Sequence, residues 1–183
     1  APWLPTGGPR GLEGSMVPMK DVKLDYNAQT LPIFSNEVNR VLGGGIVKGS
    51  VLLLAGEPGI GKSTLLLQLA ASIVEDCKGR VVYLSGEENS EQIAARAHRL
   101  KLKTEDIYLI CDIDTDEAIS SILNIEGESG PPALVIVDSI QTMRTASCTS
   151  SMGSVTQTRE SAARFVQLAK STGSAVLLVG LAE

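Results

Sequence analysis

Short, continuous runs of apolar residues recur along the chain from Val51 onward, separated by longer segments of mixed character. The runs are rich in Val, Ile and Leu and do not alternate with polar residues. That pattern is typical of strands buried on both faces of a parallel sheet. The predicted strands are residues 51–55, 81–84, 107–110, 133–137 and 175–179. We therefore expect a five-stranded sheet at the centre of the domain.

The segments between these runs have the spacing of helices that pack against a sheet. The pairs Asn89/Gln92 and Ser154/Gln157 have the spacing of a capping box, and Gly173 is a typical helix-stop residue. The predicted helices are residues 62–75, 90–100, 116–123 and 154–171. Regular alternation of strands and helices predicts an α/β fold, with a mostly parallel five-stranded sheet and helices on both faces.

The first residues of the chain lack this alternation. Residues 1–18 hold four of the eight prolines and four of the 18 glycines, a composition typical of a flexible linker. We expect residues 1–30 to form a flexible N-terminal arm and residues 31–183 to form the core.

Composition and charge exclude several classes of protein. With 16 basic and 21 acidic residues, the net charge of −5 excludes a basic protein that coats nucleic acid. DNA binding would need a local patch, or a pore lined by several subunits. No apolar run approaches the ~20 residues of a membrane span, so we expect no membrane partner. The three cysteines form no C-x-x-C pair, which argues against a local zinc site.

The strongest chemical signal is GEPGIGKS at residues 56–63, which matches the phosphate-loop pattern at every fixed position. It follows a predicted strand and opens a predicted helix, the context that this motif requires. Its three glycines let backbone amides converge on one anion at the helix N-terminus. We expect Lys62 to reach the β- and γ-phosphates, Ser63 to hold Mg²⁺ and Thr64 to contact the α-phosphate. The predicted nucleotide-binding residues are Gly56, Glu57, Pro58, Gly59, Ile60, Gly61, Lys62, Ser63 and Thr64.

Acidic residues follow two of the predicted strands. Asp138 ends the strand 133–137 and is expected to bind Mg²⁺ with Ser63; the alternative role is an N-cap. Glu87 and Glu88 follow the strand 81–84. We predict that Glu87 is the base that polarises the attacking water, because it lies nearer the strand end. The alternative is that both glutamates are solvated acids favoured by the helix dipole.

Several stretches together resemble one family. They are RVLGGGIVKGS at 40–50, GEPGIGKSTLLL at 56–67, YLSGEE at 83–88, VDSIQT at 137–142 and GSVTQTRESAARFVQLAK at 153–170. Over residues 31–180 the sequence closely resembles the RadA (Sms) family of DNA repair proteins, from bacteria and plant organelles. RecA, KaiC and the DnaB-type helicases share the phosphate loop but resemble the other stretches less well.

This resemblance implies a RecA-like P-loop NTPase core that hydrolyses ATP with Mg²⁺. Proteins of the family assemble into hexameric rings, bind single-stranded DNA and promote branch migration of recombination intermediates. By resemblance, Lys62, Ser63 and Thr64 are Walker-A residues, Glu87 is the catalytic glutamate and Asp138 is the Walker-B aspartate. The implied location is the cytoplasm in a bacterium, or the chloroplast or mitochondrion in a plant.

The resemblance also marks a DNA-facing segment. Residues 144–153, RTASCTSSMG, correspond to the first DNA-facing loop of such cores, and their one cation, Arg144, is the DNA-binding candidate. We expect this loop to be mobile, because its residues are small and polar.

The chain departs from the family at both ends. It has no four-cysteine zinc module, and the resemblance stops at Leu181, before the KNRFG motif and the Lon-protease-like domain of the family. We therefore expect a core that is truncated at its C-terminus. Two alternatives stay open. One is a nucleotide-dependent assembly module with little hydrolysis, and the other is a KaiC-like ATPase with a protein partner.

Overall fold

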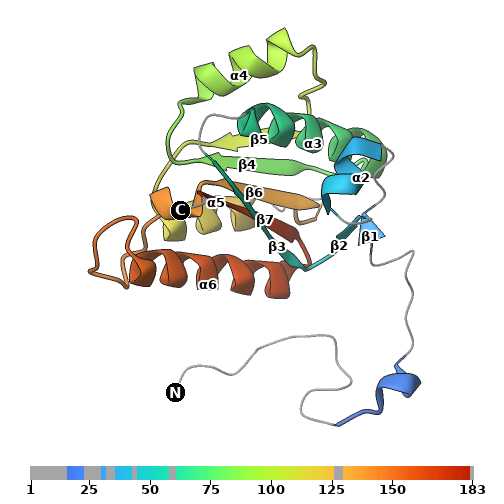
Figure 1. The fold of residues 1–183 in the computed structure, drawn as a ribbon, viewed down its shortest axis with the longest axis vertical. Helices are drawn as coiled ribbons and strands as arrows, with labels where there is room; N and C mark the ends of the chain where they lie inside the picture. Colours follow the sequence, from blue (N-terminus) through green and yellow to red (C-terminus); the bar gives the residue numbers. More distant parts are fainter. Residues whose placement is uncertain are drawn as a thin grey trace.

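The structure is a computed structural model that describes residues 16–22, 30–31, 36–42, 45–57, 61–125 and 130–181. Its centre is a five-stranded sheet with the strand order β3-β7-β6-β4-β5, and every pairing in it is parallel (Figure 1). The strands are β3 (Val51–Gly56), β4 (Val81–Ser85), β5 (Ile107–Ile110), β6 (Leu134–Asp138) and β7 (Ala175–Leu181). The predicted α/β fold with a parallel five-stranded sheet is confirmed, and the strand ends differ from the prediction by at most two residues.

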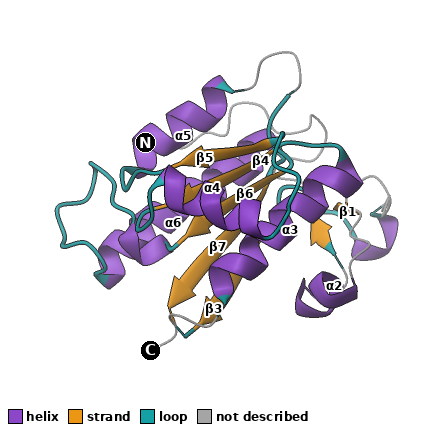
Figure 2. Cartoon of the chain, turned by 90° about the horizontal axis from the view of Figure 1, so that it is seen from above, coloured by secondary structure: helices purple, strands orange, loops and turns teal. Residues whose placement is uncertain are grey.

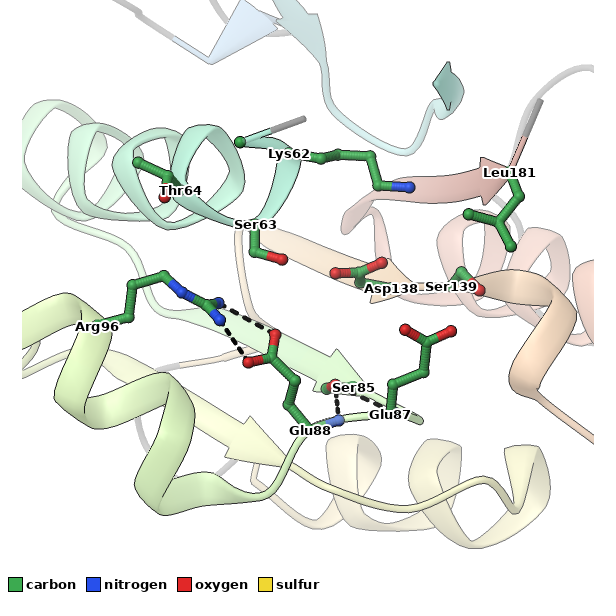
Figure 3. Close-up of a pocket in the computed structure, with 11 residues that line it drawn as sticks. Lys62, Ser63, Thr64, Ser85, Glu87, Glu88, Arg96, Asp138, Ser139 and Leu181 are labelled. Atoms are coloured by element: carbon green, nitrogen blue, oxygen red, sulfur yellow. Dashed lines mark hydrogen bonds and ion pairs between the residues drawn. The ribbon is translucent and has the colours of Figure 1, made fainter. Parts of the chain in front are cut away.

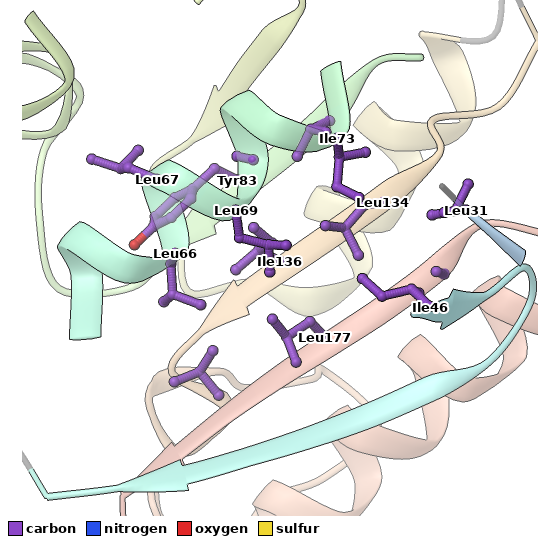
Figure 4. Close-up of a cluster of buried hydrophobic side chains, with 14 of the residues drawn as sticks. Leu31, Ile46, Leu66, Leu67, Leu69, Ile73, Tyr83, Leu134, Ile136 and Leu177 are labelled. Carbon is purple, nitrogen blue, oxygen red and sulfur yellow. The ribbon is translucent and has the colours of Figure 1, made fainter. Parts of the chain in front are cut away.

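Helices cover both faces of this sheet, as Figures 1 and 2 show. The long helices are α3 (Lys62–Cys77), α4 (Ser90–Arg99), α5 (Thr115–Asn124) and α6 (Val155–Thr172). Helices α3 and α4 contribute to one apolar cluster, and α5 and α6 contribute to a second cluster on the opposite face. Alternate residues of β4 belong to the two clusters. Tyr83 faces α3 (Figure 4), whereas Val82 and Leu84 belong to the cluster on the other face. Because both faces are covered, the strands are apolar without alternation.

A small antiparallel pair, which the sequence analysis did not predict, lies beside the main sheet. Thr30 of β1 (Thr30–Leu31) pairs with Val47 of β2 (Ile46–Val47), and the short helix α2 (Asn36–Leu42) lies between these strands in the chain. Leu31 and Ile46 are buried in the first apolar cluster (Figure 4). Thr30, which the sequence analysis assigned to the arm, therefore belongs to a strand. Of the earlier arm residues, the structure describes 16–22, which contain the turn η1 (Met19–Asp21) and no buried residue.

The predicted helix caps are confirmed in part. Asn89 and Gln92 form a complete capping box at the start of α4, and Gly173 ends α6 in the left-handed conformation. The Ser154 side chain caps α6, but Gln157 does not complete a box there. Its amide oxygen accepts from the backbone of Thr145 and its amide nitrogen donates to the Ser150 carbonyl, so this side chain holds a neighbouring loop instead.

No helix within the described ranges has the length and apolar character needed to cross a bilayer.

Candidate nucleotide-binding site

A cavity of about 280 Å³ opens at the carboxyl edge of the sheet, where β3, β4, β6 and β7 end (Figure 3). Parallel strands bring their carboxyl ends to one edge, so residues that follow different strands meet there. The lining residues are Gly61, Lys62, Ser63, Thr64, Ser85, Glu87, Glu88, Arg96, Asp138, Ser139 and Leu181. Motifs that are far apart in the sequence therefore share one pocket.

The phosphate loop reaches this pocket between β3 and α3. Gly61, the N-cap residue of α3, has φ of 57°, in the left-handed region that favours glycine, and no side chain caps the first turn of the helix. The amides of that turn are thus available to an anion, and the helix dipole favours one there. Gly56 ends β3 and Glu57 is exposed, whereas the predicted contacts Pro58, Gly59 and Ile60 lie outside the described residues.

Lys62 and Ser63 come from the first turn of α3, and Asp138 comes from the end of β6. Figure 3 shows that the Lys62 ammonium and the Ser63 hydroxyl point toward the Asp138 carboxylate. Thr64 also lines the pocket. A cation, a hydroxyl and a carboxylate at a helix N-terminus are groups that suit a phosphate chain and a hard metal ion.

Tyr83 is a site residue that the sequence analysis missed. It is fully buried in β4, and its hydroxyl donates a hydrogen bond of 3.1 Å to Oδ2 of Asp138. Burial raises the pKa of Tyr83 well above its ordinary value, and the neighbouring Asp138 carboxylate raises it further. Tyr83 therefore stays protonated and acts as a donor. In the sequence it lies within an apolar strand and shows only the features of a core residue.

The carboxylate of Asp138 is under opposing influences. Burial raises the pKa of Asp138 above its ordinary value, while the hydrogen bond from Tyr83 and the charge of Lys62 lower it. The neighbouring charge of Glu88 raises this pKa and that of Arg96 lowers it. A bound cation would add a further stabilising charge for the ionised form.

Glu87 and Glu88 follow β4 together but their side chains diverge. Figure 3 shows the Glu87 carboxylate beside Asp138 and Ser139, whereas the Glu88 carboxylate turns toward Arg96 of α4. Glu88 receives two hydrogen bonds from Arg96, of 3.0 and 2.5 Å. Within the described parts of the chain, the Glu87 carboxylate makes no recorded ion pair or hydrogen bond. The geometry thus favours Glu87 over Glu88 as the group available to a ligand.

The segments after β4 and β6 interlock through Gly86 and Thr142. A Cβ atom at Gly86 would lie 2.1 Å from Thr142 Oγ1, so the close approach requires glycine. The Gly86 amide donates to the Asp138 carbonyl over 3.1 Å, and Thr142 Oγ1 donates to the Ser139 carbonyl over 2.7 Å. The YLSGEE and VDSIQT stretches are therefore two halves of one structure at the floor of the pocket.

Ser139 and Gln141, which the sequence analysis did not single out, also shape the carboxyl edge of the sheet. Ser139 is 1% exposed, and its hydroxyl has no hydrogen-bond partner among the described residues. Gln141, in the turn η2 (Ile140–Thr142), brackets the backbone of Leu181: its Nε2 donates to the carbonyl oxygen and its Oε1 accepts from the amide. The end of β7 is thereby joined to the Asp138 segment.

The DNA-binding candidate Arg144 lies apart from this pocket. It is exposed and lines a separate cavity with the loop that follows β6. The start of that loop is anchored, because Asp116 Oδ2 accepts hydrogen bonds from Thr145 Oγ1 (2.7 Å) and the Ala146 amide (3.2 Å). Gln157 holds the same loop from α6. The first residues of the loop are therefore hydrogen-bonded to α5 and α6, and the mobility of the loop stays a prediction.

The fold and the pocket together define a phosphate-loop nucleotide-binding domain. Comparison with known families agrees, since the pattern of the AAA domain family matches residues 31–180. The sequence is 48% identical to the DNA repair protein RadA of Halalkalibacterium halodurans over 144 residues, which are 79% of this chain and 30% of that protein. It is 41% identical to RadA of Escherichia coli over 174 residues, which are 93% of this chain and 36% of that protein. The chain belongs to the AAA domain family and, within it, to the RadA (Sms) family of DNA repair proteins. It spans about a third of the length of these relatives.

Proposed function

We propose that this chain is the ATP-hydrolysing, Mg²⁺-dependent core of a RadA-type DNA repair motor. The observation that carries the proposal is the convergence of Lys62, Ser63, Glu87 and Asp138 on one cavity at the N-terminus of α3. Family membership supports nucleotide binding, and the four side chains are those that phosphoryl transfer to water requires.

The donor set suits Mg²⁺. No group of three or more His, Cys, Asp or Glu side chains that could hold a metal ion occurs in the described ranges. Mg²⁺ in nucleotide sites does not need such a group, because it takes one or two protein oxygens and completes its shell with phosphate oxygens and water. The Ser63 hydroxyl and the Asp138 carboxylate would supply those protein oxygens. A bound Mg²⁺ would neutralise negative charge on the phosphate chain.

Each of these residues has a distinct role in the proposed hydrolysis. The amides of the first turn of α3 bind the phosphate chain, and Lys62 places a positive charge on the β- and γ-phosphates. Glu87 orients a water molecule toward the γ-phosphorus and accepts its proton as the new P–O bond forms. The bond between the γ-phosphorus and the bridging oxygen breaks, and ADP keeps the electron pair.

The partners proposed for the working protein are single-stranded or branched DNA and further copies of the chain in a hexameric ring. Two observations support the DNA partner, whereas the hexameric ring rests on the resemblance to the RadA family. The described relatives are named as DNA repair proteins, and the exposed Arg144 lies on the loop after β6, away from the nucleotide pocket. One cation per chain binds DNA weakly, so several copies would have to converge on one strand.

Steady-state ATP turnover tests the proposal. The native chain should release phosphate only with Mg²⁺, and single-stranded DNA should stimulate the rate. Asp138→Asn should bind ATP without metal as before and lose the Mg²⁺ response. Asp106→Asn, a change of the same size at an exposed acid outside the pocket, is the matched control. ATP binding without turnover under any condition would instead support a nucleotide-dependent assembly module.

A further inference from the structure

We propose that Arg96 is a positioning residue for the hydrolysis described above: it holds Glu88 away from the reaction centre, so that Glu87 is the carboxylate that faces the γ-phosphate. The inference rests on the proposed ATP hydrolysis, and it assigns to the site a residue that belongs to none of the recognised motifs. The evidence is the geometry of one ion pair and of the turn from which both glutamates project.

The ion pair is a two-bond contact. Arg96 Nη1 lies 3.0 Å from Glu88 Oε1, and Nη2 lies 2.5 Å from Oε2 (Figure 3). The two side chains are 24% and 23% exposed, so the pair is largely shielded from water. A planar guanidinium can donate two parallel hydrogen bonds to one carboxylate, which fixes its orientation as well as its charge. A lysine ammonium is a point charge and does not offer this match.

The backbone around the pair is also fixed. Ser85 Oγ accepts hydrogen bonds from the amides of Glu88 (3.1 Å) and Glu87 (3.4 Å), which shapes the turn between β4 and α4. The Asn89 capping box fixes the start of α4 directly afterwards. Ile93 and Ala97 of α4 are buried in the first apolar cluster, so Arg96 projects from an anchored helix. The Glu88 side chain cannot change direction freely while the pair is intact.

The pair of Arg96 and Glu88 also affects the charge balance of the pocket. Two adjacent carboxylates and Asp138 would otherwise face a polyanionic ligand together, which like-charge repulsion disfavours. Glu88 and Arg96 both line the pocket, and their opposite charges are paired there at 2.5 Å, so the guanidinium balances the charge of the Glu88 carboxylate. Loss of Arg96 would leave the Glu88 charge unbalanced beside Ser63 and Asp138.

A double-mutant cycle on the full chain tests this proposal. Arg96→Ala should lower single-turnover ATP hydrolysis about ten-fold or more, because small displacements of reacting groups carry costs of that order. Glu88→Gln should cost less, and the double variant Arg96→Ala/Glu88→Gln should recover toward the rate of Glu88→Gln. Arg96→Lys should remain clearly impaired, since it keeps the charge but not the paired geometry. Arg99→Ala, on the same helix and exposed, is the matched control.

A second readout does not depend on turnover. The freed Glu88 charge in Arg96→Ala should weaken Mg²⁺–ATP binding by roughly three- to ten-fold, and the double variant should restore it. An Arg96→Ala variant with native kcat and affinity would overturn the proposal. So would a double variant as impaired as Arg96→Ala, since Arg96 would then act on the nucleotide and not through Glu88. Absence of turnover in the native chain would instead count against the proposed ATPase function, while the binding cycle would still test the pair.

Discussion

The hydroxyl of Tyr83 donates a hydrogen bond to Oδ2 of Asp138 over 3.1 Å, from one strand to the end of its neighbour. The strands β4 and β6 pair with Tyr83 opposite Ile136, which places the ring beneath the acid two residues further on. The bond occupies one carboxylate oxygen, and among the described residues no hydrogen bond to the other oxygen is present. It thereby fixes the orientation of the acid that we propose for Mg²⁺.

Tyr83→Phe should weaken Mg²⁺-dependent ATP binding by about ten-fold to a hundred-fold, because hydrogen bonds to charged groups contribute about 1.5–3 kcal/mol. The bond from Tyr83 lowers the pKa of Asp138, so its loss raises that pKa further. Metal binding needs the ionised acid and is lost as the pH falls through this pKa. The loss should therefore begin at a higher pH in the variant, as calorimetric titrations across pH can show. Identical pH profiles would contradict the assignment.

Lys62→Ala should weaken ATP binding at least ten-fold, about 1.4 kcal/mol, because Lys62 supplies charge directly at the phosphates. Calorimetry with ATP and ADP measures the effect. Lys48→Ala removes an exposed lysine outside this pocket and serves as the control. An unchanged affinity of Lys62→Ala for ATP would contradict the phosphate-loop assignment.

Glu87→Gln should retain ATP binding and lose turnover by roughly 10²–10⁴-fold, the usual cost of removing a positioned base. Glu88→Gln should lose much less, since Arg96 holds that carboxylate away from the centre. Phosphate release under single-turnover conditions compares the two variants directly. The reverse order of effects would show that Glu88 is the base.

Gly86→Ala should destabilise the fold by about 1–3 kcal/mol, the usual cost of overpacking. The added Cβ would lie 2.1 Å from Thr142 Oγ1, so Thr142 would have to move and its bond to Ser139 would break. Denaturant unfolding measures the loss. In the double variant Gly86→Ala/Thr142→Ala, removal of the Thr142 hydroxyl should restore part of the lost stability. Purely additive changes in the free energy of unfolding would argue against the contact between Gly86 and Thr142.

Single-stranded DNA should bind the monomer only in the non-specific range of roughly 10⁻⁴–10⁻⁶ M, because the chain is acidic and the loop carries one cation. Tighter binding should require ATP and assembly. Arg144→Ala should weaken DNA binding by the assembled protein and reduce the dependence of this affinity on salt concentration. Arg159→Ala, on α6, is the control. Fluorescence anisotropy with a labelled oligonucleotide measures both. Nanomolar binding by the monomer would reveal a different DNA surface.

Local patterns in the sequence were sufficient for the five strands of the main sheet and the four long helices, and they singled out the side chains that we propose act on a nucleotide. The small pair of β1 and β2 and the helix α2 were not predicted. Apolar runs predicted all five strands of the main sheet because a strand covered on both faces must be apolar throughout. The glycines and Lys62 identified the phosphate loop, since few residue types allow that backbone conformation. Asp138 and Glu87 could be placed near it because the carboxyl ends of parallel strands share one edge.

Contacts between distant segments could not be predicted in this way. They depend on the strand order and register of the sheet, and the periodicity of a short segment specifies neither. Only the pairing of β4 with β6 shows that Tyr83, apparently a core residue, donates to Asp138. The insertion of β7 between β3 and β6 brings Leu181 to Gln141, 40 residues earlier in the chain. Gln157 has the spacing of a capping residue, yet its side chain finds better-placed backbone groups at Thr145 and Ser150. A side chain bonds to whatever partner the packed fold places within reach, and that placement is a property of the whole chain.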